Sequence, residues 1–238
     1  MESPYGLPCV ENCLSCELRS DSFFCSLPKE SLEAFNQVKH AAVYPAGAVI
    51  FVEGQTPRGI FVLCQGQAKL STTSREGKTF ILRIAKPGEI IGLHSVVSGK
   101  PYELTVETMK PSQLDFVASD DFIRFIKEHG DACLRAAQHL SRDCRDAYDV
   151  VRSIGLSRSA PARVAKFLLE YVADEQATNG TVHAKLVLTH EDLSQLMGTS
   201  RETITRTLAD FRKKEIVELK GSTLTIHNNS ALEKLVVA

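Results

Sequence analysis

The feature that most constrains the fold is the passage LTHEDLSQLMGTSRETITRTLADFRKKEIV, which spans residues 188–217. Its apolar residues recur at helical spacing on both sides of one glycine, Gly198. They are Leu193, Leu196 and Met197 before the glycine, and Ile204, Leu208 and Phe211 after it. Because glycine permits a tight turn, the passage predicts two short helices joined as a helix-turn-helix.

The second of these helices has a polar face that is expected to point out of the domain. Four side chains fall on it, centred about 120° from the apolar stripe: Arg201, Glu202, Thr205 and Arg206. An arginine can donate two hydrogen bonds to O6 and N7 of guanine, and a carboxylate can accept one from N4 of cytosine. The face therefore predicts recognition of double-stranded DNA.

Local charge supports this prediction, although the whole chain has a formal net charge of only -1. Residues 200–220 carry six basic and four acidic side chains, and Arg212, Lys213 and Lys214 stand where phosphates could run. The alternative is that Thr199 and Glu202 form a capping box and that the arginines are only a solvated face. The two interpretations are partly compatible, since the start of a recognition helix is also where it meets the bases.

The rest of the chain predicts an α+β protein. Residues 28–40 have the pattern of a helix that begins at Pro28. Short apolar runs separated by glycine follow between Tyr44 and about Val117, which is typical of an antiparallel roll. Helical composition returns from Ser119 to Ile154 with a break at His129 and Gly130, and residues 155–161 are rich in turn formers. The remaining expected elements are a helix at 162–175, a strand at 185–188, helices at 190–198 and 200–215, and a hairpin that turns at Gly221 and Ser222.

Composition and motifs exclude several classes of protein. Hydrophobic residues make up 43% of the 238 residues and charged residues 24%, which is typical of a globular protein with a packed core. No run approaches the roughly 18 apolar residues of a membrane span, and the N-terminus lacks a signal-peptide profile. We therefore expect a cytoplasmic protein with no membrane partner. No sequence motif of an enzyme active site occurs in a credible context, so no catalytic residue is assigned.

Four of the seven cysteines crowd into the first 25 residues, with the spacing C-x3-C-x2-C-x8-C. They are Cys9, Cys13, Cys16 and Cys25. Thiolates this close in sequence can converge on one metal centre, and four is the usual number for iron-sulfur clusters and for structural zinc. Spacing alone does not separate the two metals. A thiol-based redox switch and incidental small apolar cysteines are the other two interpretations.

A seam of six residues recurs at steps of three and four along the helix that follows Gly130. It consists of Leu134, Ala137, Ser141, Cys144, Tyr148 and Val151. This seam either packs on the protein's own roll or forms a subunit interface.

Taken together, these patterns resemble the family of the cyclic-AMP receptor protein and the fumarate-nitrate reduction regulator, the Crp/Fnr family. The similarity runs from about residue 28 to residue 231, and its strongest motif is SRETITR at residues 200–206. The resemblance implies an N-terminal β-roll of the cyclic-nucleotide-binding jelly-roll type, a long dimerisation helix and a C-terminal winged helix-turn-helix. The implied domains are a cysteine-rich sensor segment at 1–27, a sensor roll at 28–118, dimerisation helices at 119–154, a hinge at 155–161 and a DNA-binding domain at 162–238.

The same resemblance implies a transcriptional regulator that binds a palindromic DNA site as a homodimer and acts on RNA polymerase. Arg201, Glu202 and Arg206 take the base-reading positions, with Thr205 beside them and Thr199 and Ser200 at the start of the helix. We expect a half-site close to TGTGA over TTGAT. The N-terminal cysteines resemble those of the oxygen-sensing members, which favours an iron-sulfur cluster of the [4Fe-4S] type. The corresponding region of the roll, residues 109–117, has no cysteine, so either all four ligands are N-terminal, which we favour, or Cys64 replaces one.

Cyclic AMP is not expected as the signal. Aligned on Gly92 with the cyclic-nucleotide branch, the glutamate that holds the ribose is replaced by Leu93, the phosphate-binding arginine by Glu103, and its hydroxyl neighbour by Leu104. A carboxylate at the phosphate position would repel a cyclic phosphate. His94 lies near this slot and is the residue that a haem-binding alternative would use.

Overall fold

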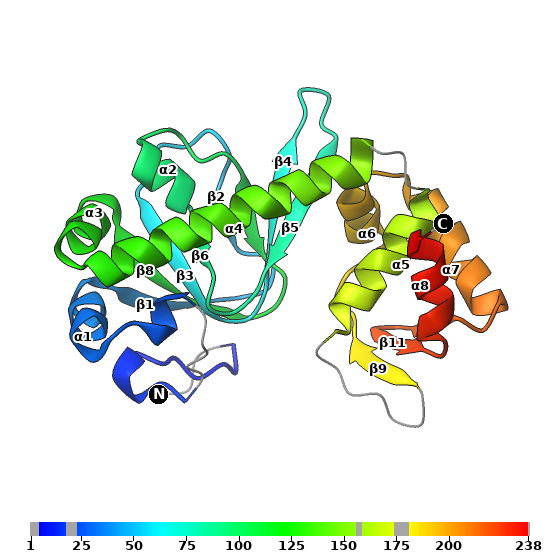
Figure 1. Cartoon of the computed structure of the whole chain (residues 1–238), viewed down its shortest axis with the longest axis horizontal. Coiled ribbons are helices and arrows are strands. Elements are labelled where there is room, and N and C mark those ends of the chain that lie inside the picture. Colours follow the sequence, from blue (N-terminus) through cyan, green and yellow to red (C-terminus); the bar gives the residue numbers. More distant parts are fainter. Residues whose placement is uncertain (1–4, 18–22, 156–158, 174–180, 238) are drawn as a thin grey trace. The chain divides into compact units, whose positions relative to one another are not determined.

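The computed structural model describes residues 5–17, 23–155, 159–173 and 181–237, and Figure 1 shows its elements in chain order. The chain separates into two compact units, Met1–Tyr148 and Asp149–Ala238. The first unit holds a β-roll with flanking helices, and the second holds a helix-turn-helix with a small sheet. The predicted α+β fold class is confirmed. Within the described ranges, no helix combines the length and the apolar composition needed to cross a bilayer.

The roll consists of two four-stranded antiparallel sheets. The first sheet has the order β1 (His40–Tyr44), β8 (Ser112–Ala118), β3 (Gly59–Gln65) and β6 (Ile90–Ile91). The second has the order β2 (Val49–Phe51), β7 (Thr105–Thr108), β4 (Ala68–Thr73) and β5 (Thr79–Ala85). In the first sheet β8 is central, with Ala42 opposite Leu114 on one side and Val62 opposite Asp115 on the other.

Aromatic residues fill the space inside the roll. The ring of Phe51 stacks on that of Tyr102 with 3.7 Å between centroids and an angle of 12°. The Tyr102 hydroxyl donates a hydrogen bond of 2.6 Å to the carbonyl of Gly59. Gly59 itself cannot carry a side chain, because a Cβ would lie 2.0 Å from the carbonyl oxygen of Val117. The interior of the roll is therefore closed by side chains of the protein.

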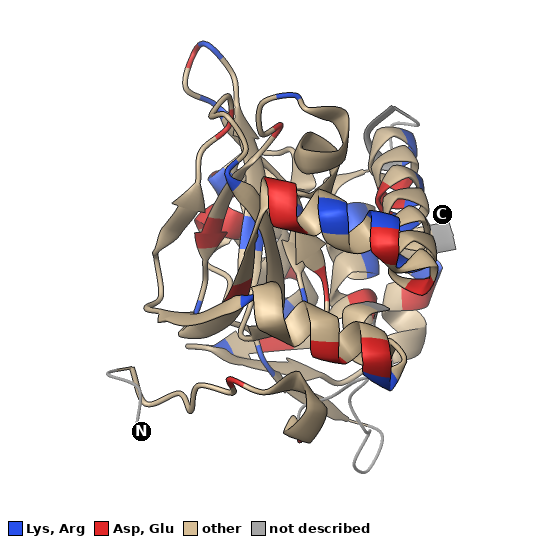
Figure 2. Ribbon diagram, turned by 90° about the vertical axis from the view of Figure 1, so that its left-hand side faces the viewer, with Lys and Arg blue, Asp and Glu red and all other residues tan. Residues whose placement is uncertain are grey.

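A second apolar cluster covers the outer face of the first sheet. It joins η2 (Phe23–Ser26), α1 (Lys29–Val38) and α3 (Ser119–Glu128) to β3 and β8. Phe24 contacts Phe35 and Phe125, with ring centroids 5.3 and 6.1 Å away. Figure 2 looks onto the end of the roll that carries α1 and α3, and it shows Lys, Arg, Asp and Glu residues along helices on this side. The two helices are thus amphipathic, with their apolar faces against the sheet.

The break predicted in the helical region is present. The helix α3 ends at Glu128, and α4 (Gly130–Gly155) begins two residues later. A short helix that the sequence did not predict, α2 (Leu93–Ser98), lies within the proposed nucleotide-binding segment. Glycines with positive φ delimit it, Gly92 at +84° and Gly99 at +69°. Glycine adopts this left-handed conformation without strain, so it can begin and end a helix sharply.

The second unit contains the predicted helix-turn-helix and a three-stranded sheet. Its elements are α5 (Ala160–Tyr171), β9 (Val182–Lys185), α6 (His190–Met197), α7 (Arg201–Lys213), β10 (Val217–Lys220), β11 (Thr223–Ile226) and α8 (Asn229–Val237). The sheet order is β10, β11, β9. The predicted hairpin turns at Gly221, whose φ is +60°, and the helix α8 was not predicted.

Two boundaries differ from the sequence-based expectation. The strand expected at 185–188 is β9 at Val182–Lys185, because pairing with β11 fixes it: Val182 lies opposite Ile226 and Lys185 opposite Thr223. The hinge expected at 155–161 is shorter, because Ser159 caps α5 and Pro161 fits its first turn. The central part of that hinge, residues 156–158, lies outside the described residues.

Candidate DNA-binding surface and cysteine pocket

The recognition helix α7 is delimited by well-defined caps. The preceding helix α6 begins with a capping box between Thr189 and Asp192 and ends at Gly198, which has left-handed φ and ψ of 60° and 40°. At the start of α7, the Ser200 hydroxyl accepts a hydrogen bond of 3.2 Å from the amide of Thr203. The capping box proposed between Thr199 and Glu202 is therefore wrong, because Ser200 is the N-cap.

The four predicted base-reading residues lie together on the exposed side of α7. Arg201, Glu202, Thr205 and Arg206 are exposed, and so is Ser200, whereas Thr199 is half-buried. The opposite face buries Ile204, Thr207, Leu208 and Phe211. The helix packs on α6, α5 and β10 through that face. A rigid scaffold thus presents two arginines and a carboxylate to solvent.

The pKa of Glu202 is lowered, first by its own backbone amide and then by a hydrogen bond with Ser200 and the charge of Arg201. The carboxylate is therefore ionised at neutral pH and acts as a hydrogen-bond acceptor. It suits the exocyclic amine of cytosine.

Sequence analysis missed His190, the first residue of α6. Its Nδ1 lies 3.0 Å from Oγ1 of Thr205, and that hydroxyl also donates a hydrogen bond of 3.0 Å to the carbonyl of Arg201. A second link joins the two helices to α5, since Nε of Arg163 donates to the carbonyl of Met197 at 2.9 Å. These bonds fix the two helices of the motif against each other.

Basic residues gather at the C-terminal end of α7. Arg212, Lys213 and Lys214 are all exposed. Glu218 on β10 offsets part of this charge, because it lies 3.6 Å from Arg212 and 3.1 Å from Lys220. Both ion pairs are at the surface, where such pairs contribute little to stability, so both cations are available to phosphates.

The seam on α4 is exposed along its whole length. All six predicted residues, Leu134, Ala137, Ser141, Cys144, Tyr148 and Val151, are exposed, and the three largest side chains are between 60% and 66% accessible. The residues of α4 that pack on the roll lie on another face of the helix, namely Ala132, Ala136 and His139. The interpretation that the seam packs on its own roll is therefore wrong. An apolar stripe of this kind on a helix typically marks a site of association.

The three substituted positions of the proposed nucleotide slot differ in their exposure. Leu93 is buried in α2 and Leu104 is partly buried, while Glu103 is exposed. His94 lies 3.6 Å from the Asp143 carboxylate of α4, and Arg83 lies 3.2 Å from the same side chain. The position that would hold a phosphate arginine in a cyclic-nucleotide receptor thus presents a carboxylate to solvent.

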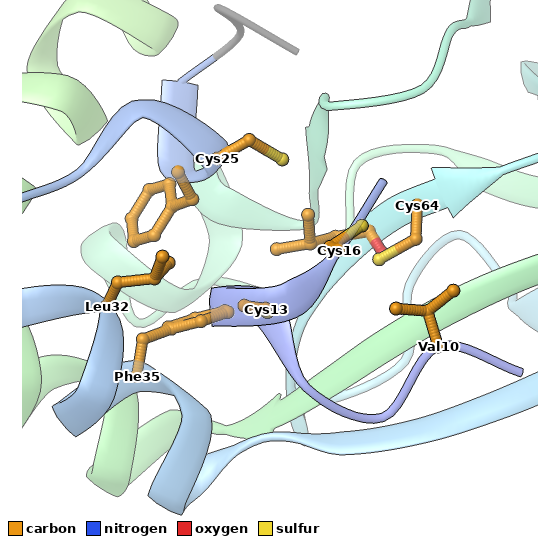
Figure 3. A pocket seen from close by; sticks show the side chains of 9 residues that line it. Val10, Cys13, Cys16, Cys25, Leu32, Phe35 and Cys64 are labelled. Carbon is orange, nitrogen blue, oxygen red and sulfur yellow. The ribbon is translucent and has the colours of Figure 1, made fainter. Parts of the chain in front are cut away.

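Three of the four N-terminal cysteines share one pocket with a fourth cysteine from the roll. Figure 3 shows this space between the N-terminal segment, α1 and β3. It is lined by Val10, Cys13, Cys16, Phe24, Cys25, Leu32, Phe35, Val62 and Cys64. Cys9 is not among the lining residues. Cys64 enters because β3 runs directly beneath the N-terminal segment, which sequence spacing alone could not show.

Specific hydrogen bonds hold the N-terminal segment on the roll. The Gln113 side chain both donates to the carbonyl of Val10, at 2.7 Å, and accepts from its amide, at 2.8 Å. Further along, Asn36 of α1 accepts a bond of 3.0 Å from the amide of Cys13. The backbone is thus held on both sides of the residues that lead into η1 (Cys13–Ser15).

Two thiols of this pocket, those of Cys13 and Cys64, have raised pKa values, which favours their protonated forms when no ligand is bound. Burial raises the pKa of Cys13, and the charge of Asp115 adds to the effect while Lys39 opposes it. The pKa of Cys64 is raised much further, again by burial first and then by Asp115. Within the described residues, no three Cys, His, Asp or Glu side chains are already placed to hold a metal ion. The described cysteines are all free thiols.

Comparison with known proteins relates both units to regulators of transcription. Residues 42–129 match the model of the cyclic nucleotide-binding domain, and residues 162–235 match that of the Crp-like helix-turn-helix domain. The chain is 25% identical over 217 residues to the CRP-like cAMP-activated global transcriptional regulator of Mycobacterium tuberculosis, covering 89% of this chain and 94% of that relative. It is 22% identical over 232 residues to the fumarate and nitrate reduction regulatory protein of Escherichia coli, covering 95% and 91%.

The fold is likewise similar to solved structures. The structure of FixK2 from Bradyrhizobium japonicum superimposes with a TM-score of 0.74 at 21% identity and covers 84% of this chain and 98% of that one. A transcriptional regulator of the crp/fnr family from Eubacterium rectale gives a TM-score of 0.71 at 22% identity, with 89% and 96% covered. The fold, with a roll, a long helix and a helix-turn-helix in the same order along the chain, is therefore shared with these proteins.

Proposed function

The chain belongs to the Crp/Fnr family of DNA-binding transcriptional regulators, and we propose that it is a redox-responsive member whose signal enters through the cysteine pocket. The observation that carries this proposal is that Cys13, Cys16, Cys25 and Cys64 line one cavity. Members of the family are regulators and not enzymes, which agrees with the absence of a catalytic motif from the sequence. DNA binding and dimerisation follow from the same membership.

In this proposal α7 reads the bases and α4 joins the subunits. Arg201 and Arg206 donate to guanines, Glu202 accepts from cytosine, and the basic end of α7 follows the phosphates. The exposed seam from Leu134 to Val151 packs against its copy in a second chain. A two-fold dimer would place two recognition helices on half-sites roughly 34 Å apart, one turn of the duplex. RNA polymerase would be the downstream partner on the bound promoter.

The cysteine pocket suits a thiolate-ligated metal centre. Four sulfur donors on an otherwise apolar lining are the usual ligand set of an iron-sulfur cluster. We propose Cys13, Cys16, Cys25 and Cys64 as the ligands. Cys64 thus replaces Cys9, which the sequence-based ligand set contained. The hydrogen bonds of Gln113 hold the segment at Val10. Val10 is also the first residue of the pocket lining, so Cys9, which precedes it, lies outside the lining.

A cluster in this pocket would supply reactivity toward oxygen. The residues of the chain supply the response, because Cys64 belongs to the roll while the other three ligands belong to the N-terminal segment. Ligation would tie that segment to β3 through four further bonds, and loss of ligation would leave it held by hydrogen bonds such as those of Gln113, Asn36 and Gln65. Such a switch shifts an equilibrium only by its differential affinity for the two states. We expect oxygen to lower the affinity for the operator.

Cyclic AMP has no place in the proposal. The Mycobacterium tuberculosis relative is named as cAMP-activated, but in this chain Leu93 and Glu103 stand where the family binds ribose and phosphate. The stacked rings of Phe51 and Tyr102 close the interior of the roll.

The test is metal analysis of anaerobically purified protein together with an absorption spectrum before and after exposure to air. We expect iron and acid-labile sulfide in place of zinc, a visible chromophore that air bleaches, and a weaker gel shift afterwards. Cys64→Ser should lose the chromophore, whereas Cys9→Ser and the exposed control Cys133→Ser should keep it. If the analysis finds zinc and no acid-labile sulfide, the pocket is a structural zinc site and not an iron-sulfur site. A colourless protein whose gel shift ignores air would end the redox proposal.

A further inference from the structure

A buried ion pair lies beside the cysteine pocket. Nζ of Lys39 and Oδ2 of Asp115 are 2.6 Å apart, and their side chains are 2% and 1% exposed. The same carboxylate oxygen is 4.0 Å from Sγ of Cys13. Lys39 immediately follows α1, and Asp115 lies on β8, so the pair connects the helix and the strand that flank the pocket.

Stability alone does not account for such a pair. Removing two charges from water costs several kcal/mol per ion, and apolar side chains of similar volume usually stabilise a core at least as well. The neighbouring pocket is largely apolar, with Phe24, Phe35 and Val62 among its lining residues. A charged pair in this position therefore points to a role toward something that the neighbouring thiols bind.

The partners of Lys39 favour its charged form. Burial opposes the charged form of Lys39, but the hydrogen bond and the charge of Asp115 outweigh it, so the pKa of Lys39 is raised. Gln113 donates to the other oxygen of Asp115 at 3.2 Å. Since an ammonium group has three donors and one is directed at Asp115, two remain for other acceptors.

Sulfur atoms lie close to the ion pair. Oδ2 of Asp115 lies between the ammonium group and the nearer sulfur, 2.6 Å from Nζ of Lys39 and 4.0 Å from Sγ of Cys13. The charges of Cys13 and Cys64 are also among the causes that raise the pKa of Lys39. Both cysteines are ligands in the function proposed above. Four thiolates around a doubly charged metal centre leave an excess of negative charge, which burial makes costly unless a cation lies close by.

We propose that Lys39 is the charge-balancing residue of the cysteine pocket: its ammonium group is held by the carboxylate that also contacts Cys13, and its charge raises the affinity of the four thiolates for a metal centre. This inference rests on the proposed function, since it takes the pocket to be a metal site. Lys39 is a positioning residue and not a ligand. Residues that hydrogen-bond to metal ligands commonly change metal affinity by about 10–100-fold.

The test is titration of the full-length, reduced apoprotein with cobalt(II) alone, followed through the absorption bands of cobalt-bound thiolate. We expect Lys39→Met to weaken cobalt binding by about 10-fold or more. Asp115→Asn breaks the same ion pair but removes a negative charge beside the sulfurs, so it should bind cobalt at least as tightly as the wild type. Lys39→Arg, which keeps the charge, should restore most of the affinity. Lys69→Met removes a lysine paired with Glu107 in the second sheet and serves as the matched control.

The different effects expected for Lys39→Met and Asp115→Asn on cobalt affinity separate charge balance from a structural role. If Lys39→Met and Asp115→Asn weaken cobalt binding alike, the pair only supports the fold and the inference is overturned. If Lys39→Met binds cobalt like the wild type, the inference is also overturned, while the metal pocket stands. If the wild type gives no thiolate bands, the metal pocket itself fails. Circular dichroism checks the fold of each variant. If Lys39→Met does not fold, the other two variants decide: charge balance requires that Asp115→Asn binds cobalt at least as tightly as the wild type and that Lys39→Arg keeps most of the affinity. Weaker binding by Asp115→Asn then overturns the inference.

Discussion

Nδ1 of His190 lies 3.0 Å from the hydroxyl oxygen of Thr205. The same hydroxyl donates its hydrogen to the carbonyl of Arg201 at 3.0 Å, so it has a partner on each side. The Thr205 hydroxyl is engaged within the protein, and its methyl group is the part left to contact a base, where it suits the methyl of thymine.

This relationship predicts how two substitutions of Thr205 differ. Thr205→Val keeps a methyl group and loses the bond to His190, so the preferred sequence should persist while affinity falls by about 0.5–1.5 kcal/mol. Thr205→Ser keeps the bond and loses the methyl, so preference at one base pair should relax. Both are measured by gel shift on the site selected by the wild type from a random pool, and on its single-base variants. A Thr205→Val protein without sequence preference would show that the hydroxyl contacts DNA directly.

Arg206 is predicted to carry sequence specificity and Arg212 to carry general affinity. Both side chains are exposed, so substitution should leave the stability of the domain nearly unchanged. Arg206→Ala should cost about 1–3 kcal/mol and relax the choice of base at one position, whereas Arg212→Ala should weaken all sequences equally and reduce the salt dependence of binding. Competition gel shifts at several salt concentrations distinguish the two. Equal loss on every sequence for Arg206→Ala would remove it from the base-reading set.

The exposed seam of α4 predicts a dimer that a single charge can disrupt. Leu134 is 60% exposed in the single chain, and Leu134→Glu would place a carboxylate in the seam, where an unpaired charge is costly if the seam is buried by a second chain. We expect sedimentation to show monomers and operator affinity to fall at least tenfold. Gln138→Glu adds the same charge outside the seam at another exposed position of α4, and it should remain dimeric. Dissociation of both variants alike would argue against the seam.

Cyclic AMP is predicted not to bind, and the reason lies in packing as well as in charge. Phe51 and Tyr102 stack inside the roll, so removing the carboxylate of Glu103 should not create a binding site. Calorimetric titration should show no micromolar affinity for the wild type or for Glu103→Ala. If Glu103→Ala gains affinity, charge alone blocks the slot.

His94 predicts a specific pH dependence. Its hydrogen bond with Asp143 raises the pKa of His94, although burial opposes this, so the protonated form is favoured in the folded state. The stabilising contribution is fully present below the unfolded pKa of about 6.5 and is lost as pH rises through the higher folded pKa. His94→Gln should therefore destabilise the protein more at pH 5.5 than at pH 8.5, by less than about 1 kcal/mol because the pair is partly exposed. Urea unfolding at both pH values measures it, and a larger loss at pH 8.5 would contradict the assignment.

The helix-turn-helix could be predicted because its information is local. The spacing of Leu193, Met197 and Ile204 reports which faces are buried, and the structure buries all three. The helix α8 could have been found by the same reasoning. Asn228 caps it by accepting a hydrogen bond from the amide of Ala231, and Leu232 lies on its buried face.

The cysteine pocket could be predicted only in part. Most of β3 is buried on both faces, so alternation in its sequence does not show which side Cys64 faces. The pairing of Lys39 with Asp115 joins residues 76 positions apart, and no local pattern encodes such a contact. The cap of α7 was misplaced by one residue because Thr199 and Ser200 are both good N-cap residues.

Gln113 forms hydrogen bonds with both the amide and the carbonyl of Val10, and with no atom of the Val10 side chain. Val10 lies in an extended stretch where no helix or sheet protects the amide, so hydrogen–deuterium exchange at this single position reports directly on docking of the segment. If the Val10 amide exchanges slowly in the reduced protein and fast after oxidation, its exchange rate distinguishes the two states of the regulator without a chromophore or a DNA-binding assay.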